Sequence, residues 1–189
     1  MGNLKLSKVL ESFLKLHPTP KSGGKNTGNT SHGIKWEQQL ENWFNKHNIQ
    51  YSYQPNGSQM PPEFRVRMPN GKTIEIEQKT SKTGKPMWNS TLPQAGTLYI
   101  VGCTESGKNG MWFGEDLIEN TDRDRLEEFH KTLMSLVNSY NQAAGSDSKY
   151  YYGQRGRFDT RFNPFKDKSD AHLNKEKLNT IRRLNAELN

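Results

Sequence analysis

The sequence predicts an α/β domain in which a central mixed β-sheet is flanked by helices. Four segments place apolar residues at the three- and four-residue spacing of an amphipathic helix. Between the second and third of these lie segments that alternate apolar and polar residues or run as short apolar stretches. A mixed sheet with helices packed beside it accounts for this order of elements.

The helices are predicted from their apolar stripes. They cover about residues 3–16, 33–48, 122–143 and 169–188. The stretch from Pro18 to Gly33 is rich in glycine and polar residues, which predicts a mobile loop. Thr121 is the expected N-cap of the third helix, because a threonine side chain can accept a hydrogen bond from the first turn.

Strands are predicted between the second and third helices. Residues 63–79 alternate on both sides of a Pro-Asn-Gly turn and form a hairpin. Residues 97–102 are a short apolar run, which is typical of a buried strand, and residues 111–113 form a further strand.

A chain of 189 residues predicts one domain with a core of its own. We expect three parts within it: residues 1–32 as an N-terminal helix and mobile loop, 33–144 as the core, and 145–189 as a basic C-terminal region.

Composition and charge narrow the class of partner. Lys and Arg number 27 against 20 Asp and Glu, which gives a net charge of +7, and only 31% of residues are hydrophobic. A basic excess favours a polyanionic partner such as DNA, because neutralising phosphates releases counterions. Cys103 is the only cysteine, and no apolar run approaches the length of a membrane span. We therefore expect a cytoplasmic protein without a membrane partner.

The pattern of the hairpin determines which residues face each other. A two-residue Asn-Gly turn would pair Phe64 with Glu77 and mix the two faces. A three-residue turn with Gly71 in the left-handed position instead pairs Phe64 with Ile76 and keeps the faces separate. This register places Glu63 directly opposite Glu77, at a Cβ separation of roughly 5 Å.

Lys79 lies two residues beyond Glu77 and therefore on the same face of the strand. Two carboxylates held this close repel each other and need a counterion. Clustered oxygen ligands without cysteine or histidine favour Mg²⁺, and a neighbouring ammonium can orient a water molecule and offset charge on a phosphate. The alternative is a solvated strand face with cross-strand ion pairs, of which Arg65 opposite Glu75 is an expected example.

Pro62-Glu63 followed by Glu77-Gln78-Lys79 resembles the PD-(D/E)xK nuclease signature, most closely that of type II restriction endonucleases. The resemblance covers about residues 33–101 and implies a restriction-endonuclease-like fold. It implies that Glu63, Glu77 and the backbone carbonyl of Gln78 bind Mg²⁺, and that Lys79 positions the attacking water. This sequence departs from the commoner pattern in having Glu63 where most members have aspartate.

Members of this family often carry another acidic residue on a helix before the hairpin. Glu37 and Glu41 are the candidates, both on the predicted helix 33–48. At 100° per residue, Glu37 borders the buried face and Glu41 faces solvent. Glu37 is therefore the fourth candidate catalytic residue, and an ordinary exposed glutamate is the alternative.

Two segments are candidates for contact with DNA. The polar stretch after Lys79 offers cations for phosphates, an amide for adenine and an indole for stacking. The C-terminal region mixes arginines, the usual readers of guanine, with aromatic residues. The candidate DNA-binding residues are Lys82, Lys85, Trp88, Asn89, Ser90, Arg155, Arg157 and Arg161. A surface loop with Trp88 anchored in the core, and a solvated basic face, are the alternatives.

The leading hypothesis is a Mg²⁺-dependent type II restriction endonuclease that acts as a homodimer on double-stranded DNA. A two-fold dimer presents two active sites to the two strands of a symmetric site. A Holliday-junction resolvase would keep the chemistry and change the substrate. A non-catalytic DNA-binding protein would keep the fold alone, and the presence of both Glu77 and Lys79 argues against it.

Overall fold

The computed structural model describes residues 5–20, 29–57, 60–89, 92–144, 157–158 and 163–187, with the backbone alone at 29–33, 89 and 157–158. Its elements in chain order are α1 (Leu6–Leu16), α2 (Asn29–Lys46), β1 (Tyr51–Tyr53), β2 (Phe64–Arg67), β3 (Thr73–Ser81), β4 (Trp88–Asn89), β5 (Leu98–Cys103), β6 (Asn109–Phe113), the 3₁₀ turn η1 (Gly114–Asp116), α3 (Asn120–Ala143), β7 (Arg157–Phe158) and α4 (Asp170–Glu187). The protein is therefore an α/β protein.

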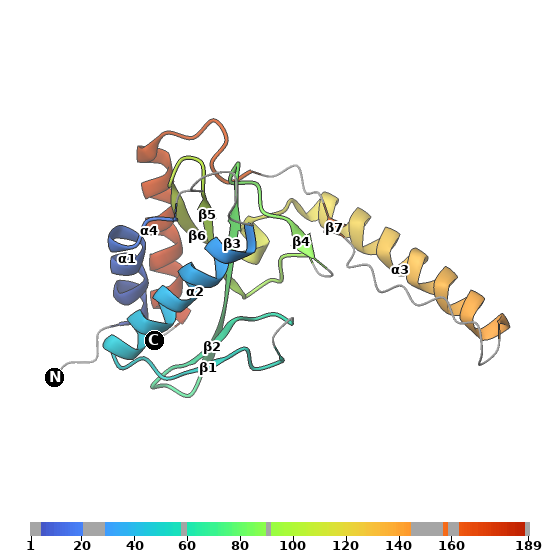
Figure 1. Ribbon diagram of the computed structural model, residues 1–189, viewed down its shortest axis with the longest axis horizontal. Coiled ribbons are helices and arrows are strands. Elements are labelled where there is room, and N and C mark those ends of the chain that lie inside the picture. Colours follow the sequence, from blue (N-terminus) through green and yellow to red (C-terminus); the bar gives the residue numbers. More distant parts are fainter. Residues whose placement is uncertain are drawn as a thin grey trace.

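Five of the strands form one mixed sheet in the order β1-β2-β3-β5-β6 (Figure 1). β3 and β5 run parallel, and the other neighbouring strands run antiparallel. A parallel pair needs a long connection between its strands. This connection carries β4, which pairs with β7 in a separate two-stranded ribbon.

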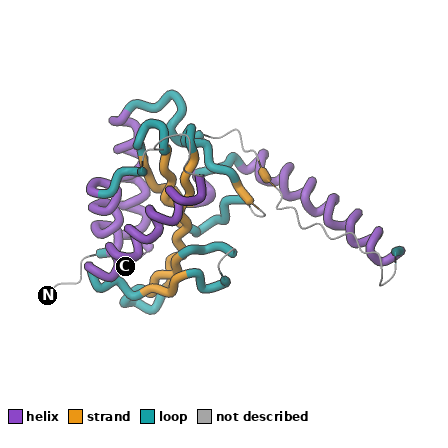
Figure 2. Tube along the Cα trace, in the orientation of Figure 1, coloured by secondary structure: helices purple, strands orange, loops and turns teal. Residues whose placement is uncertain are grey.

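Helices cover one face of the sheet. The side chains of Ile76, Ile100 and Met111 pack on this face in one buried cluster with apolar residues of α1, α2 and α4. Figure 2 shows these three helices gathered on one side of the strands. Burial of this apolar surface is the main force that holds the helices to the sheet.

The opposite face of the sheet is covered mainly by loop segments and the short strand β4. Its buried cluster contains Trp88, Tyr99, Trp112 and Phe165, with Leu117 and Ile118 before α3. The predicted mixed sheet with helices beside it is therefore confirmed, and the helices flank this sheet only in part. The candidate site lies on this second face, because Glu77 is level with Tyr99 in the parallel register.

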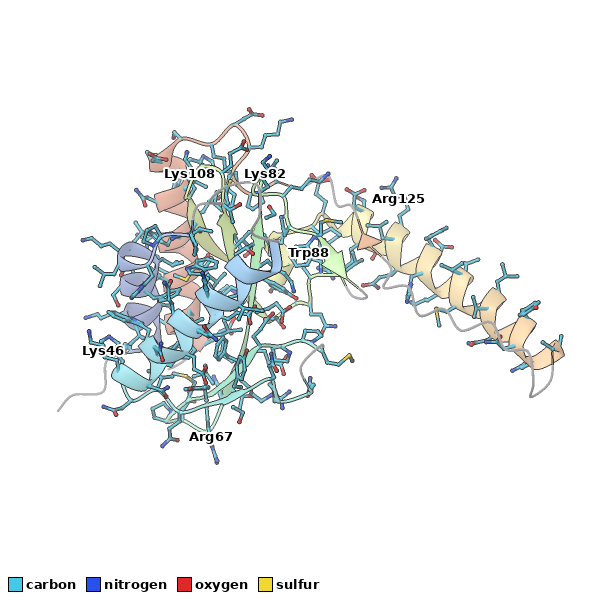
Figure 3. All side chains as sticks on the ribbon, viewed as in Figure 1. Lys46, Arg67, Lys82, Trp88, Lys108 and Arg125 are labelled. Carbon is cyan, nitrogen blue, oxygen red and sulfur yellow. The ribbon has the colours of Figure 1, made fainter. Side chains whose placement is uncertain are left out.

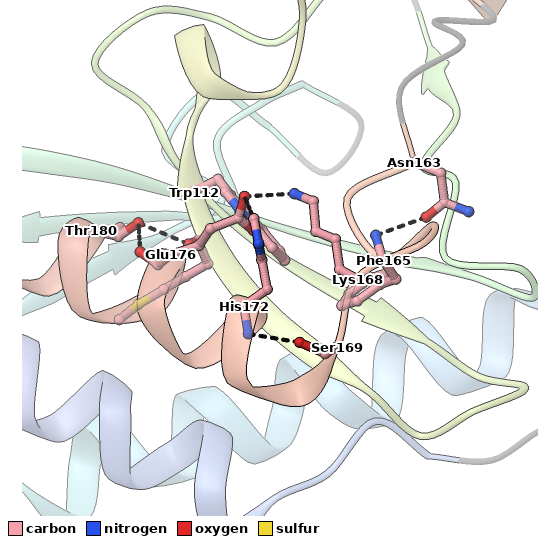
Figure 4. A network of polar contacts seen from close by, with 9 residues as sticks. Trp112, Asn163, Phe165, Lys168, Ser169, His172, Glu176 and Thr180 are labelled. Carbon is pink, nitrogen blue, oxygen red and sulfur yellow. Dashed lines mark hydrogen bonds and ion pairs between the residues drawn. The ribbon is translucent and has the colours of Figure 1, made fainter.

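A polar cluster fixes the N-terminal half of α4 against β6 (Figure 4). The carboxylate of Glu176 accepts hydrogen bonds from Lys168 Nζ at 2.6 Å and from Trp112 Nε1 at 3.2 Å. The hydroxyl of Thr180 donates to the carbonyl of Met111 at 3.0 Å. These contacts satisfy polar groups beside the core and set the position of the helix on the strand.

Two predicted boundaries of helices are wrong. α2 begins at Asn29, inside the stretch expected to be a loop from Pro18 to Gly33. Before it, the hydroxyl of the buried Thr19 donates to the carbonyl of Lys108 at 3.1 Å, so this part of the stretch is fixed to the body. α3 begins at Asn120 after the N-cap Glu119, and Thr121 is therefore within its first turn.

α3 extends away from the sheet and the other helices (Figure 1). None of its residues is buried. Within the described ranges, no helix is both long and apolar enough to cross a bilayer.

Candidate functional site

The β2–β3 hairpin has the predicted register. Phe64 pairs with Ile76 and Val66 with Ile74. Gly71 has φ +83°, in the left-handed region, and its N–H donates to the carbonyl of Met68 at 2.9 Å. The three-residue turn is therefore confirmed, and it separates the apolar face of the hairpin from the face that carries the acids.

Glu63 immediately precedes the first residue of β2, and β3 continues past this end of its neighbour. Its Oε2 accepts a hydrogen bond from the backbone N–H of Gln78 at 2.9 Å. The N–H and C=O of one strand residue point to the same side of the strand, so the Gln78 carbonyl is also directed toward the side of Glu63. At this position the backbone N–H of Gln78 on β3 therefore binds the Glu63 side chain and not the backbone of β2.

Buried Glu77 forms an ion pair with partly buried Lys79 on β3. Lys79 Nζ donates to Glu77 Oε1, and only 5% of the Glu77 side chain is exposed. The second carboxylate oxygen of Glu77, Oε2, is buried and accepts no hydrogen bond from an N–H group or a hydroxyl among the described residues, and a protonated Glu63 also hydrogen-bonds the Glu77 carboxylate. Two buried carboxyl groups this close repel each other when both are ionised, so a cation beside them would be favourable.

The electrostatics of the site follow from its burial. Burial, followed by a hydrogen bond with the Glu77 side chain and the charge of Glu77, raises the pKa of Glu63 to about 10. Burial alone would lower the pKa of Lys79, but the neighbouring carboxylates of Glu77 and Glu63 outweigh it and raise that pKa. Without a bound cation, Glu63 is therefore protonated at neutral pH and the Lys79 ammonium balances Glu77.

The helix α2 brings a third acid toward this pair. Burial raises the pKa of Glu37, and the charges of Lys79 and Glu77 also act on it. Tyr53 on β1 donates its hydroxyl to Glu37 Oε2 at a long 3.5 Å. Glu41 instead accepts a hydrogen bond from the Tyr51 hydroxyl at 3.1 Å. Of the two glutamates considered on this helix, Glu37 is the one whose charge is linked to Glu77 and Lys79.

A divalent cation fits this arrangement only in part. Across the described residues, no group of three or more histidine, cysteine, aspartate or glutamate side chains is gathered closely enough to hold a metal ion. Mg²⁺, however, usually takes one or two carboxylates and completes its shell with water. Glu63, Glu77 and the Gln78 carbonyl meet that lower requirement, and the close approach of the two buried carboxyl groups is the observation that favours a cation.

The predicted DNA contacts have different outcomes. Trp88 is 2% exposed and packs edge-on against Tyr99 at 5.2 Å, so it is a core residue and its expected stacking on DNA is wrong. Lys82 is exposed just past the end of β3, and Lys85 is half-buried (Figure 3). Lys82 is therefore exposed where it could contact a phosphate, whereas Trp88 packs in the core.

The two segments expected to contact DNA lie together. The backbone of Asn89 in β4 pairs with that of Arg157 in β7. The side chains of these two residues, and all of Ser90, Arg155 and Arg161, lie outside the described residues. This pairing was not predicted, and it joins the segment after Lys79 to the arginine-rich C-terminal region.

Tyr53 was missed as a residue near the site. It lies on β1, a three-residue strand that was not predicted from the sequence. The alternation of Tyr51, Ser52 and Tyr53 was the available signal, but three residues are too few for a periodicity argument.

Comparison with known proteins leaves the family open. No protein-family model matches the chain, and neither the curated proteins nor the solved structures contain a match.

Proposed function

We propose that this protein is a Mg²⁺-dependent endonuclease that hydrolyses phosphodiesters of double-stranded DNA, of the type II restriction enzyme kind with a restriction-endonuclease-like fold. The observation that carries the proposal is the convergence of Glu63, Glu77 and Lys79 where β2 ends beside β3. Two neighbouring acids beside an ammonium are the groups needed to bind a cation and to act on a phosphate.

Each side chain of the candidate site would have a separate role in hydrolysis. Glu63 and Glu77, with the Gln78 carbonyl, would hold Mg²⁺, which supplies a Lewis acid and lowers the pKa of a bound water. Lys79 would orient the attacking water and offset negative charge on the phosphate. Glu37 would act beside Lys79, since its charge is already linked to that ammonium.

Binding of the cation would change the protonation of Glu63. A carboxyl with a pKa near 10 carries a proton at neutral pH, and a metal ligand must lose it. Loading the site would therefore release a proton.

The charge of the chain supports DNA as the polyanion. The net charge is +7, and exposed Lys82 follows directly on the strand that carries Glu77 and Lys79. Contacts from such lysines to phosphates would position the duplex without reading its sequence. The arginines near β7 are the candidates for reading bases, and a homodimer would present two such surfaces to a symmetric site.

Incubation of the purified protein with plasmid DNA and Mg²⁺, followed by sequencing of the fragment ends, tests the proposal. A restriction enzyme gives discrete fragments that disappear when EDTA removes the metal. Cutting of four-way junctions but not plasmid indicates a resolvase with the same site. Binding to DNA without any cutting, with Mg²⁺ present, contradicts the catalytic proposal.

A further inference from the structure

Two tyrosines of β1 contact two glutamates of α2. The hydroxyl of Tyr51 donates to Glu41 Oε1 at 3.1 Å, and the hydroxyl of Tyr53 donates to Glu37 Oε2 at 3.5 Å. Glu37 and Glu41 are four residues apart, so they are neighbours on the surface of the helix. The two contacts therefore join the same strand to the same helix with the same chemistry, and they differ in what surrounds each glutamate.

The Tyr53 contact is the one directed toward the candidate site. The charges of Lys79 and Glu77 act on Glu37, and the charge of Glu63 acts on Tyr53. The Tyr51 hydroxyl instead also contacts the exposed side chain of Asn45, at 3.1 Å. The two tyrosines thus form a matched pair, with one beside the acids and the ammonium and the other beside solvent.

The surroundings of the Tyr53 hydroxyl direct its proton toward Glu37. The side-chain amide of Gln54 donates to the Tyr53 hydroxyl oxygen at 3.1 Å. A hydroxyl that accepts from an amide still has its own O–H for another acceptor. Burial, followed by the charges of nearby glutamates, raises the pKa of Tyr53, so the hydroxyl stays protonated at neutral pH and remains a donor.

The backbone of Gln54 fixes this end of β1 to Glu63. Gln54 has φ +44°, in the left-handed region that residues with side chains rarely adopt. Its N–H donates to the carbonyl of Glu63 at 2.7 Å. Backbone held in this region tends to occur where function needs a fixed geometry. The same residue therefore binds the backbone of Glu63 and the hydroxyl that contacts Glu37.

We propose that Tyr53 is a positioning residue whose hydroxyl holds the Glu37 carboxylate beside Lys79 during hydrolysis of the phosphodiester. This inference rests on the proposed function and adds a residue that acts through Glu37 and does not touch the reacting atoms. A glutamate at the border of a helix face can adopt several rotamers, and a contact from the neighbouring strand selects among them. The contact is long at 3.5 Å, and contacts of this kind often shorten when substrate is bound.

Tyr53→Phe and Tyr51→Phe test the proposal as a pair. Each removes one hydroxyl and keeps the ring that packs against Phe64. Single-turnover cleavage at saturating protein in Mg²⁺ is measured, together with affinity for duplex DNA. We expect Tyr53→Phe to lower the cleavage rate about tenfold without changing affinity, because a small displacement of a group at the site is costly. Tyr51→Phe should cut like the wild-type protein, and thermal unfolding checks that both variants fold.

A double-mutant cycle shows whether Tyr53 acts through Glu37. Cleavage is compared in Glu37→Ala and in Glu37→Ala combined with Tyr53→Phe. If the hydroxyl acts only by holding the carboxylate, it has no effect once the carboxylate is absent, so the two variants cut at the same rate. A general structural role of Tyr53 would lower the rate by the same factor in both backgrounds.

The outcomes separate this role from the proposed function. Equal cleavage by the wild-type protein and Tyr53→Phe, or equal losses in the two tyrosine variants, would overturn the role of Tyr53 and leave the nuclease standing. Loss of affinity for duplex in place of cleavage rate would overturn it as well. A wild-type protein that binds duplex in Mg²⁺ and cuts no DNA would contradict the proposed function, and the role of Tyr53 would be rejected with it.

Discussion

Two glutamate–cation pairs lie two residues apart on the same face of β3, and they differ in their surroundings. Glu75 pairs with Arg65 at 2.7 Å, and their side chains are 35% and 37% exposed. Glu77 pairs with Lys79, and their side chains are 5% and 25% exposed. Glutamates on the same face of one strand therefore form an exposed ion pair at one position and a largely buried one at the next.

The neighbouring strand explains the difference. β5 pairs with β3 only from Ile76 onward, so Glu75 lies beyond its start. Glu77 lies beside Tyr99, inside the cluster that also contains Trp88. An exposed ion pair contributes little because water screens it, whereas burial shifts pKa values. The burial of Glu77 separates the candidate site from the exposed glutamate on the same strand face.

The largest expected effect comes from removing the partly buried ammonium of Lys79. Lys79→Ala should lower the rate of DNA cleavage by at least about 100-fold, because it removes a positive group from beside the reacting phosphate. Binding to duplex should change little. Single-turnover cleavage and a gel-shift titration measure the two effects. Turnover at the wild-type rate would exclude this role for Lys79.

The next largest effect is the dependence of the free energy of unfolding on pH that Glu63 causes. The Glu63 pKa is raised from 4.5 to about 10, so the folded protein holds a proton that the unfolded chain has lost between these values. Its contribution is full at low pH and falls as pH rises toward 10, by up to about 1.4 kcal/mol per pH unit. Urea unfolding in EDTA across this range should show the slope.

Glu63→Gln is the matched variant for that slope. Glutamine keeps the size of the side chain but cannot titrate, so the fall in stability between mildly acidic and basic pH should become smaller. Equal slopes in the wild-type protein and the variant would show that Glu63 is ionised in the folded state.

Lys82 extends the comparison to an exposed lysine just past the end of β3. Lys82→Ala should weaken binding to duplex severalfold and reduce the slope of log affinity against log salt by about one, whatever the DNA sequence. Cleavage at saturating protein should remain. Fluorescence anisotropy at several salt concentrations measures the slope, and an unchanged slope would exclude a phosphate contact.

The smallest effect is expected at the exposed pair. Arg65→Ala should lower the free energy of unfolding by less than about 1 kcal/mol, because water screens the charges of both partners. Chemical denaturation measures it, and a loss of several kcal/mol would mean that burial does not separate the two pairs.

The hairpin was predictable from the sequence because local rules determine it. The three-residue turn with Gly71 and the strict alternation on either side leave one register that separates the faces. That register alone places Glu63 level with Glu77. The direction of the Glu37 side chain could also be anticipated, because helix geometry is regular.

Other features depend on contacts between distant segments. The burial of Trp88 requires Tyr99 and Phe165, and the pairing of β4 with β7 joins residues about 70 positions apart in the chain. The apolar stripe of α3 was visible in the sequence, but periodicity identifies a face and not what covers it. The raised pKa of Glu63 likewise follows from three-dimensional burial, which no spacing reveals.

The most direct test of the central claim compares Glu77→Gln with Glu75→Gln. Both variants remove one negative charge from the same face of β3, and both replace glutamate with a side chain of the same size. Cleavage of plasmid DNA in Mg²⁺ is the measurement, with circular dichroism to confirm folding. We predict that Glu75→Gln cuts like the wild-type protein and that Glu77→Gln does not cut. Equal cleavage by the two folded variants would contradict a catalytic metal site at Glu77.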